Sequence, residues 1–430
     1  MNEFVSIVGA QHVTEESGAF IVAPASTEET AVVLRLCSAR KLTVSPRGGG
    51  TKLDWGNQVT PQVIVDTRRL DGIREHVWQD MTATVGAGTN WAEMEHALAE
   101  HKQHVALDPL FAAQATVGGV IAVNDSGALR MRYGSLRDLV IGMTIVLADG
   151  TIARSGGKVV KNVAGYDLPK LLTGSFGTLG ITTEVTFRLH PMQPRAETWT
   201  VRSDEIEPLI ALQQQLLTAA MSIESLEIRL GAVDPLFNGR VRLQPHHKDD
   251  RTDTALAAEG NTTGSFALDV RFASLPEVLR EHEQRLRVAC GTLALSTADE
   301  NVWLQRERLF ALPNMTLLKV TALPSKIGAI LQGFRSLAAS DIVAECVADA
   351  TGIVTVALSA PPEVTAELIE DLRARLRGEG GMVVVLRAGH ASAIPDRWGG
   401  SPPAIAVMRA IKQQFDPDRL LNPGKFVGGI

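Results

Sequence analysis

The sequence predicts an α+β protein with a glycine-rich first part and a longer second part in which strands and helices alternate. The chain has 430 residues, and 21 of its 38 glycines lie in the first 190. At about 100–200 residues per domain, this length suggests two to three domains. The segment 192–195, which contains Pro194 and directly follows Pro191, separates the two parts. A hairpin signal between strands of the second part predicts an antiparallel sheet there.

The composition excludes several classes of protein. The net charge is −6, from 42 basic and 48 acidic residues, which argues against a protein whose main task is to hold nucleic acid. Cys37, Cys290 and Cys346 are too far apart to form a zinc knuckle or to ligate an iron–sulfur cluster. An odd cysteine count without a signal peptide is typical of the cytoplasm, and no apolar run reaches the ~18 residues of a membrane span. We therefore expect a cytoplasmic protein without a metal site, which reaches the inner face of the membrane only through partners.

The first part contains clear local signals. A helix over 24–41 begins with the capping-box pair Ser26 and Glu29, and a helix over 90–102 begins at Asn90. Asp149-Gly150, between strands at 144–148 and 151–153, predicts a type I′ hairpin turn. Further strands are expected at 42–45, 63–66, 82–85 and 181–189.

The second part alternates between the two kinds of element. The helix expected at 275–289 has the capping-box pair Ser274 and Glu277. A hairpin over 343–358 turns at Thr351-Gly352. The other expected elements are strands near 222–230, 265–272, 316–322 and 382–388, and helices over 325–338, 362–377 and 402–415.

The sharpest local feature is the loop Arg47-Gly48-Gly49-Gly50-Thr51, which follows the strand at 42–45. Its three glycines expose backbone N–H groups with no Cβ in the way, and the Thr51 hydroxyl adds a donor. The alternative is a tight turn between two strands, which would not need three consecutive glycines. We therefore expect this loop to bind phosphate.

The two common phosphate motifs do not fit the sequence. No segment matches the Walker A pattern, and Gly86-Ala87-Gly88 has Trp91 where a Rossmann fingerprint needs its third glycine. A third glycine-rich stretch, 115–119, could either pack under a helix or lie along a flat ligand. Three such loops within residues 47–127 favour a long cofactor that carries phosphate.

These motifs resemble a known family. The residues that carry the resemblance are 46–51, 107–109, 115–119, 124–127, the run GGKVVKNVAGYDLPKLLTGSFGTLG at 156–180 and the tail FDPDRLLNPGKF. They are similar to the PCMH-type FAD-binding module of the vanillyl-alcohol oxidase superfamily of FAD-linked oxidases, and within it to the FAD-binding subunits of bacterial glycolate oxidases. The resemblance covers residues 1–195 and the tail, and is looser between them.

The resemblance implies a domain organisation. A PCMH-type FAD-binding domain of two subdomains would occupy 1–195. An α+β cap domain with an antiparallel sheet, for substrate or partner, would occupy 196–395. A helix and tail over 396–430 would return to the FAD-binding domain.

The resemblance also implies a site for non-covalent FAD, held by the glycine-rich loops and the tail. The residues assigned to it are Pro46, Arg47, Gly48, Gly49, Gly50, Thr51, Gly86, Ala87, Gly88, Pro109, Ala115, Thr116, Val117, Gly118, Gly119, Ser126, Gly180, Ile181, Asn422 and Lys425.

In the second part, Trp303-Leu304-Gln305-Arg306 is similar to a family element whose arginine meets the substrate carboxylate. The alternative is an amphipathic helix over 300–310 with Trp303 buried and Arg306 in solvent. His390 lies near the place where catalytic members carry an HxHxxGxxxH-like pattern, but no second histidine lies two residues away. Trp303, Arg306 and His390 are candidate substrate residues, and the catalytic residues stay unassigned.

The resemblance implies an FAD-dependent oxidoreductase that takes part in the oxidation of glycolate, or a similar 2-hydroxy acid, to glyoxylate or the matching 2-keto acid. It implies two partners, a catalytic FAD subunit (GlcD-like) and an iron–sulfur subunit (GlcF-like). Two alternatives stay open. The chain could be a non-catalytic flavoprotein subunit, or it could be a stand-alone FAD-dependent D-lactate dehydrogenase.

Overall fold

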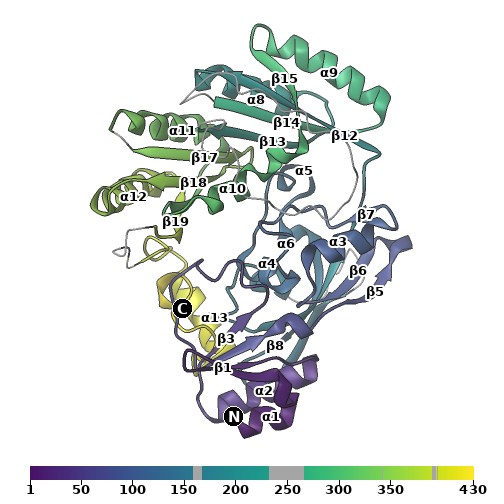
Figure 1. Ribbon diagram of the computed structural model, residues 1–430, viewed down its shortest axis with the longest axis vertical. Coiled ribbons are helices and arrows are strands. Elements are labelled where there is room, and N and C mark those ends of the chain that lie inside the picture. Colours follow the sequence, from purple (N-terminus) through teal and green to yellow (C-terminus); the bar gives the residue numbers. More distant parts are fainter. Residues whose placement is uncertain (158–166, 232–265, 341, 390–393, 395) are drawn as a thin grey trace.

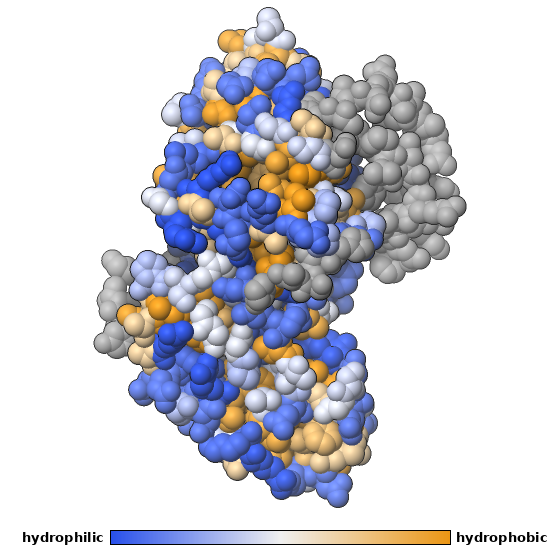
Figure 2. Space-filling view, turned by 90° about the vertical axis from the view of Figure 1, so that its left-hand side faces the viewer, coloured by the Kyte–Doolittle hydropathy of each residue, from blue (hydrophilic) through white to orange (hydrophobic). Residues whose placement is uncertain are grey.

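The computed structural model describes residues 1–157, 167–231, 266–340, 342–389, 394 and 396–430. The described chain forms two parts, stacked along the long axis of the molecule (Figure 1). We call the elements of residues 1–191, together with the C-terminal helix and tail, the base, and the elements of residues 195–387 the cap. Hydrophilic side chains predominate on the face seen in Figure 2, with smaller hydrophobic areas between them.

The base begins with a four-stranded sheet in the order β1-β2-β4-β3. The pairs β2·β4 and β3·β4 are parallel, and β1·β2 is antiparallel. Two helices pack against this sheet around a shared apolar core. The strands are β1 (Val13–Glu16), β2 (Ala19–Val22), β3 (Val44–Arg47) and β4 (Val63–Asp66), and the helices are α1 (Asn2–Val8) and α2 (Thr27–Ala39).

A five-stranded antiparallel sheet completes the base, in the order β5-β6-β10-β8-β9. Its strands are β5 (Ile73–Val77), β6 (Thr82–Gly86), β8 (Val140–Val146), β9 (Ile152–Gly156) and β10 (Ile181–Arg188). Short helices accompany it: α3 (Trp91–Ala99), α4 (Val117–Val123), α5 (Arg130–Tyr133), α6 (Leu136–Leu139) and α7 (Leu168–Leu172). The small strands β7 (Gln103–His104) and β11 (His190–Pro191) pair beside it.

The cap is built on an eight-stranded antiparallel sheet in the order β15-β12-β14-β13-β17-β18-β16-β19. Its strands are β12 (Arg195–Ser203), β13 (Ile223–Leu230), β14 (Phe266–Ser274), β15 (Ala294–Ala298), β16 (Thr316–Thr321), β17 (Val343–Asp349), β18 (Ile353–Ser359) and β19 (Met382–Arg387). Four helices pack on one face of this sheet and enclose the cap's core: α8 (Ile206–Thr218), α9 (Pro276–Cys290), α11 (Ile327–Ser336) and α12 (Pro362–Arg377).

The opposite face of the cap sheet is turned to the base. Leu317, Val347 and Leu386 of this face share an apolar cluster with Trp55 and Leu110 of the base. The short helix α10 (Gln305–Ala311) lies between the two parts (Figure 1). The last helix, α13 (Ile405–Phe415), belongs to the base, and the tail after it adds a parallel bridge to β3, Val44 to Leu421. Among the described residues, no helix has the length and apolar content of a membrane span.

Most local predictions are confirmed. Ser26 caps α2 by accepting from Glu29 N, and Asn90 caps α3 by accepting from Glu93 N. All three cysteines are buried and free. The α+β fold with an antiparallel cap sheet is confirmed as well. The proposed boundaries 1–195, 196–395 and 396–430 stay a prediction, which the distribution of the strands among the sheets supports.

Two local predictions are wrong. Ser274 does not cap α9, because it is the last residue of β14 and pairs with Arg195, so the cap position falls to Leu275. The turn at 149–150 is not type I′, because that turn needs positive φ at both central residues and Gly150 alone has it, at 81°. Instead the Asp149 carboxylate accepts from Thr151 N and closes a longer loop between β8 and β9.

Candidate functional site

The loop that follows β3 is pressed against the segment before α4. A Cβ on Gly49 would lie 1.9 Å from Gln114 O, and a Cβ on Gly48 would lie 2.0 Å from Thr116 Oγ1. Real Cβ atoms do not approach other atoms so closely, so only glycine lets these two backbone segments meet. Gly50 adds a left-handed φ of 75°, which turns the chain at the end of the loop.

A cavity of about 270 Å³ opens beside this loop, and we call it the glycine-loop cavity. Its walls are residues 45–53, Thr116 and Gly119 at the start of α4, and Asn422 and Lys425 of the tail. A smaller cavity of about 60 Å³ adjoins it, because both are lined by Pro46, Gly48, Gly119 and Ala122. The smaller cavity continues to Gly180 and Ile181, so the two together form one crevice between the sheets of the base.

Asn422 brings an unused acceptor to the glycine-loop cavity. Its Nδ2 donates to Phe176 O at 2.7 Å. Its Oδ1 is buried and accepts no hydrogen bond from the described residues. Buried polar atoms are nearly always paired, so this oxygen indicates a missing hydrogen-bond donor at the cavity wall.

Two buried lysines line the same cavity. Lys425 Nζ donates to Leu53 O at 2.7 Å, and its pKa falls to about 8 because of burial and, second, the nearby Arg397. Lys52 Nζ donates to Leu110 O at 2.8 Å and lies 3.4 Å from Asp125 Oδ2. Burial lowers the pKa of Lys52, and the Asp125 charge opposes that shift. Two cations held in a low-dielectric wall favour an anionic occupant.

Most of the residues predicted to bind the cofactor line this crevice. They are Pro46, Arg47, Gly48, Gly49, Gly50, Thr51, Thr116, Gly118, Gly119, Gly180, Ile181, Asn422 and Lys425. Their roles as cofactor ligands stay predictions.

The other predicted cofactor residues lie behind the crevice wall or at the cap. The N–H groups of Gly86, Ala87 and Gly88 donate to Gly72 O, Thr183 O and Leu70 O. These three donors are therefore already used within the base. Ala115 and Val117 are buried, and their N–H groups donate to Phe111 and Thr89. Pro109 lines a different cavity under the cap, and Ser126 O accepts from Arg306.

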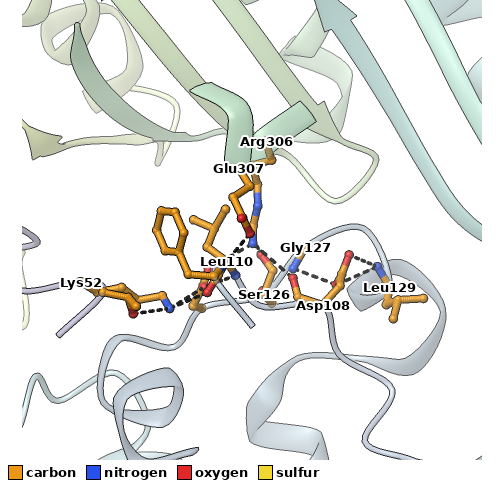
Figure 3. A network of polar contacts seen from close by, with 11 residues as sticks. Lys52, Asp108, Leu110, Ser126, Gly127, Leu129, Arg306 and Glu307 are labelled. Atoms are coloured by element: carbon orange, nitrogen blue, oxygen red, sulfur yellow. Dashed lines mark hydrogen bonds and ion pairs between the residues drawn. The ribbon is translucent and has the colours of Figure 1, made fainter. Parts of the chain in front are cut away.

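Helix α10 of the cap places Arg306 against a loop of the base (Figure 3). The guanidinium contacts Ser126 O, donates to Asp108 O at 3.3 Å and pairs with Asp125 Oδ1 at 3.3 Å. Asp108 in turn accepts from Gly127 N at 3.0 Å and Leu129 N at 3.3 Å. Burial raises the pKa of Asp108 to about 6, which Arg306 and these N–H groups oppose. The predicted helix over 300–310 breaks into a 3-10 turn, Glu300–Leu304, and α10.

A polar cavity of about 130 Å³ lies between base and cap at this contact. We call it the interdomain cavity. It is lined by Asp108, Pro109, Leu110, Gly127, Leu129, Ser225, Glu227, Arg271, Trp303, Leu304, Arg306 and Glu307. Trp303 and Arg306 therefore come together, while His390 lies outside the described residues. Among the described residues, no group of three or more side chains could hold a metal ion.

Lys52, Glu227 and Arg271 line these cavities, and Asp125 pairs with Lys52, but none of the four was predicted as a site residue. Lys52 directly follows the glycine loop, and Asp125 lies in the segment 124–127, so both could have been found by their neighbours in the sequence. Glu227 and Arg271 belong to no motif, because the neighbouring strands β13 and β14 bring them to the interdomain cavity and only the fold shows which face they take.

Comparisons with known proteins agree with this geometry. Residues 18–156 match the family described as "FAD binding domain", and residues 398–426 match "FAD linked oxidases, C-terminal domain". The glycolate oxidase subunit GlcD of Bacillus subtilis is 27% identical over an alignment of 430 positions, which covers 94% of this chain and 88% of that protein. A D-lactate dehydrogenase of Anaerostipes hadrus is 27% identical over 433 residues, with the same coverage of 94% and 88%.

Solved structures have the same fold at low sequence identity. An alkyldihydroxyacetonephosphate synthase superposes with a TM-score of 0.69 and 16% identity, covering 98% of this chain and 84% of that one. The 4-ethylphenol oxidase from Gulosibacter chungangensis, solved with isoeugenol, also has a TM-score of 0.69 and 16% identity, covering 99% and 95%.

The residues of the glycine-loop cavity fit FAD. The loop lacks the Cβ atoms that would fill its contact with the segment 114–116, the Asn422 Oδ1 acceptor is unused, and two buried cations face the cavity. The missing Cβ atoms let the loop pack on the segment 114–116 and form the cavity wall, and an anionic, hydrogen-bonding cofactor satisfies the other two features. The chain is a flavoprotein oxidoreductase with FAD as its cofactor, and it is similar to FAD-linked oxidases over residues 18–156 and 398–426.

Proposed function

We propose that this chain is the FAD-binding subunit, of the GlcE type, of a glycolate oxidase complex that converts glycolate to glyoxylate. One observation carries the proposal. The glycine-loop cavity and the polar interdomain cavity adjoin at the contact between Lys52 and Leu110 O, so a cofactor site and a small polar site are neighbours. The similarity to a GlcD subunit and to D-lactate dehydrogenases supports a small 2-hydroxy acid as substrate.

In this proposal the chain's own residues bind and orient. The loop 46–51, Asn422 and Lys425 hold non-covalent FAD, which supplies the two-electron redox chemistry when bound. The cap closes over the interdomain cavity through α10 and excludes water from it. Electrons leave to a catalytic GlcD-like FAD subunit and a GlcF-like iron–sulfur subunit, which would give the complex its place at the inner face of the membrane.

A second candidate is a non-catalytic flavoprotein subunit. Arg306, the residue that the family resemblance assigns to the substrate carboxylate, already binds Ser126 O, Asp108 O and Asp125. A guanidinium engaged in this way has few donors left for a substrate, which favours a chain that completes its partner. The third candidate, a stand-alone D-lactate dehydrogenase, is supported by the D-lactate dehydrogenase relatives.

Anaerobic mixing of the purified, FAD-loaded chain with glycolate and, separately, with D-lactate tests the three candidates. Bleaching of this chain's own flavin band by glycolate, in the isolated chain or after the partner subunits are added, supports the glycolate oxidase proposal. Fast bleaching by D-lactate alone favours the stand-alone dehydrogenase. A flavin that stays oxidised in this chain, while the partner's flavin is reduced, identifies a non-catalytic subunit.

A further inference from the structure

Glu227 stands between two other acids on the cap sheet. It lies on β13, directly opposite Asp269 of β14 on one side and opposite Asp349 of β17 on the other. All three residues are on the face that is turned to the base, and Glu227 lines the interdomain cavity. Three carboxyl groups in neighbouring strands cannot all be ionised at low cost.

The two outer acids are satisfied, and Glu227 is not. Asp269 binds Arg229 and accepts from Thr200 Oγ1 at 2.5 Å. Asp349 accepts from Thr351 N, Thr351 Oγ1 and Ile353 N. Glu227 is 4% exposed, and its Oε2 has no partner among the described residues. Glu227 is therefore the acid of the row that holds a proton, and it presents an O–H donor at the cavity.

Charged groups of the base, of α10 and of both neighbouring strands act on Glu227. Asp269 and Asp349 face it across the sheet, Asp108 faces it from the base, and Arg306 faces it from α10. Burial is the largest cause that raises the pKa of Glu227 well above its ordinary value; the three aspartates add to the shift, and Arg306 opposes it. Helix α5, which packs on β13, places Arg132 and Tyr133 against Ile223 O and Glu224 instead.

Arg271 is the second donor at this cavity. Its Nη2 lies 3.3 Å from Glu300 Oε2, and its Nε lies 3.1 Å from Glu224 Oε2 without the alignment of a hydrogen bond. A guanidinium has five N–H donors, so these two contacts leave others for a ligand. Arg306, by contrast, is held by the base.

We propose that the interdomain cavity binds a small carboxylate of the 2-hydroxy or 2-keto acid class, held by Arg271 and by a hydrogen bond from protonated Glu227. The inference rests on the proposed function, because that function supplies the class of ligand. The cavity volume of about 130 Å³ limits the ligand to a few heavy atoms. The ligand binds only when Glu227 is protonated. Above the pKa of Glu227 in the free protein, binding therefore requires the uptake of a proton, and the affinity falls as the pH rises.

Calorimetric titration of the FAD-loaded chain with oxalate, a two-carbon carboxylate without an oxidisable C–H bond, tests the inference. Binding is expected at pH 6, and it should weaken about tenfold per pH unit above the pKa of Glu227, with proton uptake seen as a dependence on buffer ionisation heat. Glu227→Gln keeps a neutral donor of the same shape, so it should bind oxalate without the loss that Glu227 causes, and only the smaller change from Asp108, whose pKa is about 6, should remain. Arg271→Met should weaken binding at least tenfold, whereas Arg202→Met, at an exposed site of the same sheet, should not change it.

Three results would overturn the inference: no oxalate binding to the folded, FAD-loaded chain at pH 6, an unchanged pH profile in Glu227→Gln, or equal losses in Arg271→Met and Arg202→Met. The failure of the proposed function is a separate result. If oxalate binds with proton uptake but glycolate reduces neither this flavin nor the complex, the cavity assignment stands and the glycolate oxidase proposal falls. If glycolate reduces the flavin and the Glu227→Gln profile is unchanged, the glycolate oxidase proposal stands and the cavity assignment falls.

Discussion

Gly49 is the residue whose replacement tests the glycine-loop cavity most sharply. In Gly49→Ala the new Cβ would meet Gln114 O at 1.9 Å, and a backbone oxygen cannot move aside cheaply. We expect the free energy of unfolding to fall by about 1–3 kcal/mol and the purified protein to carry less FAD. Gly378→Ala is the matched control, because a Cβ there meets nothing within 4 Å and the φ is −71°. Equal flavin-to-protein ratios in the two variants would contradict the assignment of the loop.

Lys425 makes the retention of FAD depend on pH. Its pKa of about 8 leaves it cationic below that pH and neutral above it, so an anionic cofactor loses an attractive charge as the pH rises through about 8. We expect FAD affinity, measured by flavin fluorescence titration, to fall between pH 7 and about 9 in the wild type. In Lys425→Met the affinity should be lower below about pH 8, where the wild type is charged, and the fall should be absent. A variant that keeps the wild-type profile would assign the titration to another group.

For single residues, the sequence predicted the candidate site well where the site residues are contiguous in the chain. The loop 46–51 and the tail residues Asn422 and Lys425 were predicted from motifs, and all of them line one cavity. The segment 86–88 has the same glycine signal, but its N–H groups are used by the base. A glycine shows that backbone comes close to something, and only the fold shows whether that is a ligand or another strand.

Among the elements, α13 is fixed by one buried ion pair. Lys412 Nζ, in a residue that is 3% exposed, pairs with Asp416 Oδ2 at 2.7 Å and donates to Thr178 O and Leu421 O. Lys412→Met would leave the Asp416 carboxylate buried with only N–H partners, at a cost of about 3–5 kcal/mol in the free energy of unfolding. The exposed pair Lys41–Asp418 provides the control, since Lys41→Met should cost at most about 1 kcal/mol. Urea denaturation of both variants measures the difference, and similar midpoints would contradict it.

Elements with a capping residue or a turn signal were predicted well, and others were missed. The stripe of Ile206, Leu209, Leu212 and Leu216 that buries α8 is present in the sequence, but no capping side chain marks where that helix begins. The capping box at Ser274 failed because β14 continues through that residue. Pairing across a sheet is a long-range property, so a local pattern cannot show where a strand ends.

For the molecule as a whole, Arg306 joins cap to base. Arg306→Leu removes its contacts with Ser126, Asp108 and Asp125 and leaves Asp125 with Lys52 as its cation. We expect a loss of about 1–3 kcal/mol in the free energy of unfolding, because the acceptors Ser126 O and Asp108 O lose their donor, and faster amide hydrogen exchange at residues 108–110 and 126–129. Arg308→Leu, in the same helix but exposed, should stay within about 0.5 kcal/mol of the wild type. If exchange at these residues is unchanged in Arg306→Leu, other contacts hold the cap.

The interdomain cavity was beyond the reach of the sequence for a geometric reason. Its polar groups come from residues 108, 227, 271 and 306, which four different segments bring together. The motif at 303–306 indicated a substrate arginine, and only the packing of α10 shows that this arginine binds the base. Residues whose charges compensate one another across two parts of a fold have no fixed spacing in the sequence, so no motif identifies them.

The bridge between the tail and β3 has a consequence for how the protein is made. Val44 N donates to Leu420 O, and Asn422 N donates to Val44 O, so the outer edge of the first sheet is covered by residues near the other end of the chain. A ribosome releases the chain from its N-terminus, so this edge stays open until translation has passed Leu420. The cavity wall that contains Asn422 and Lys425 forms at the same moment. We therefore expect the complete flavin site to form only once the tail has been made, and a chain that ends before the tail to keep an open strand edge, which favours aggregation.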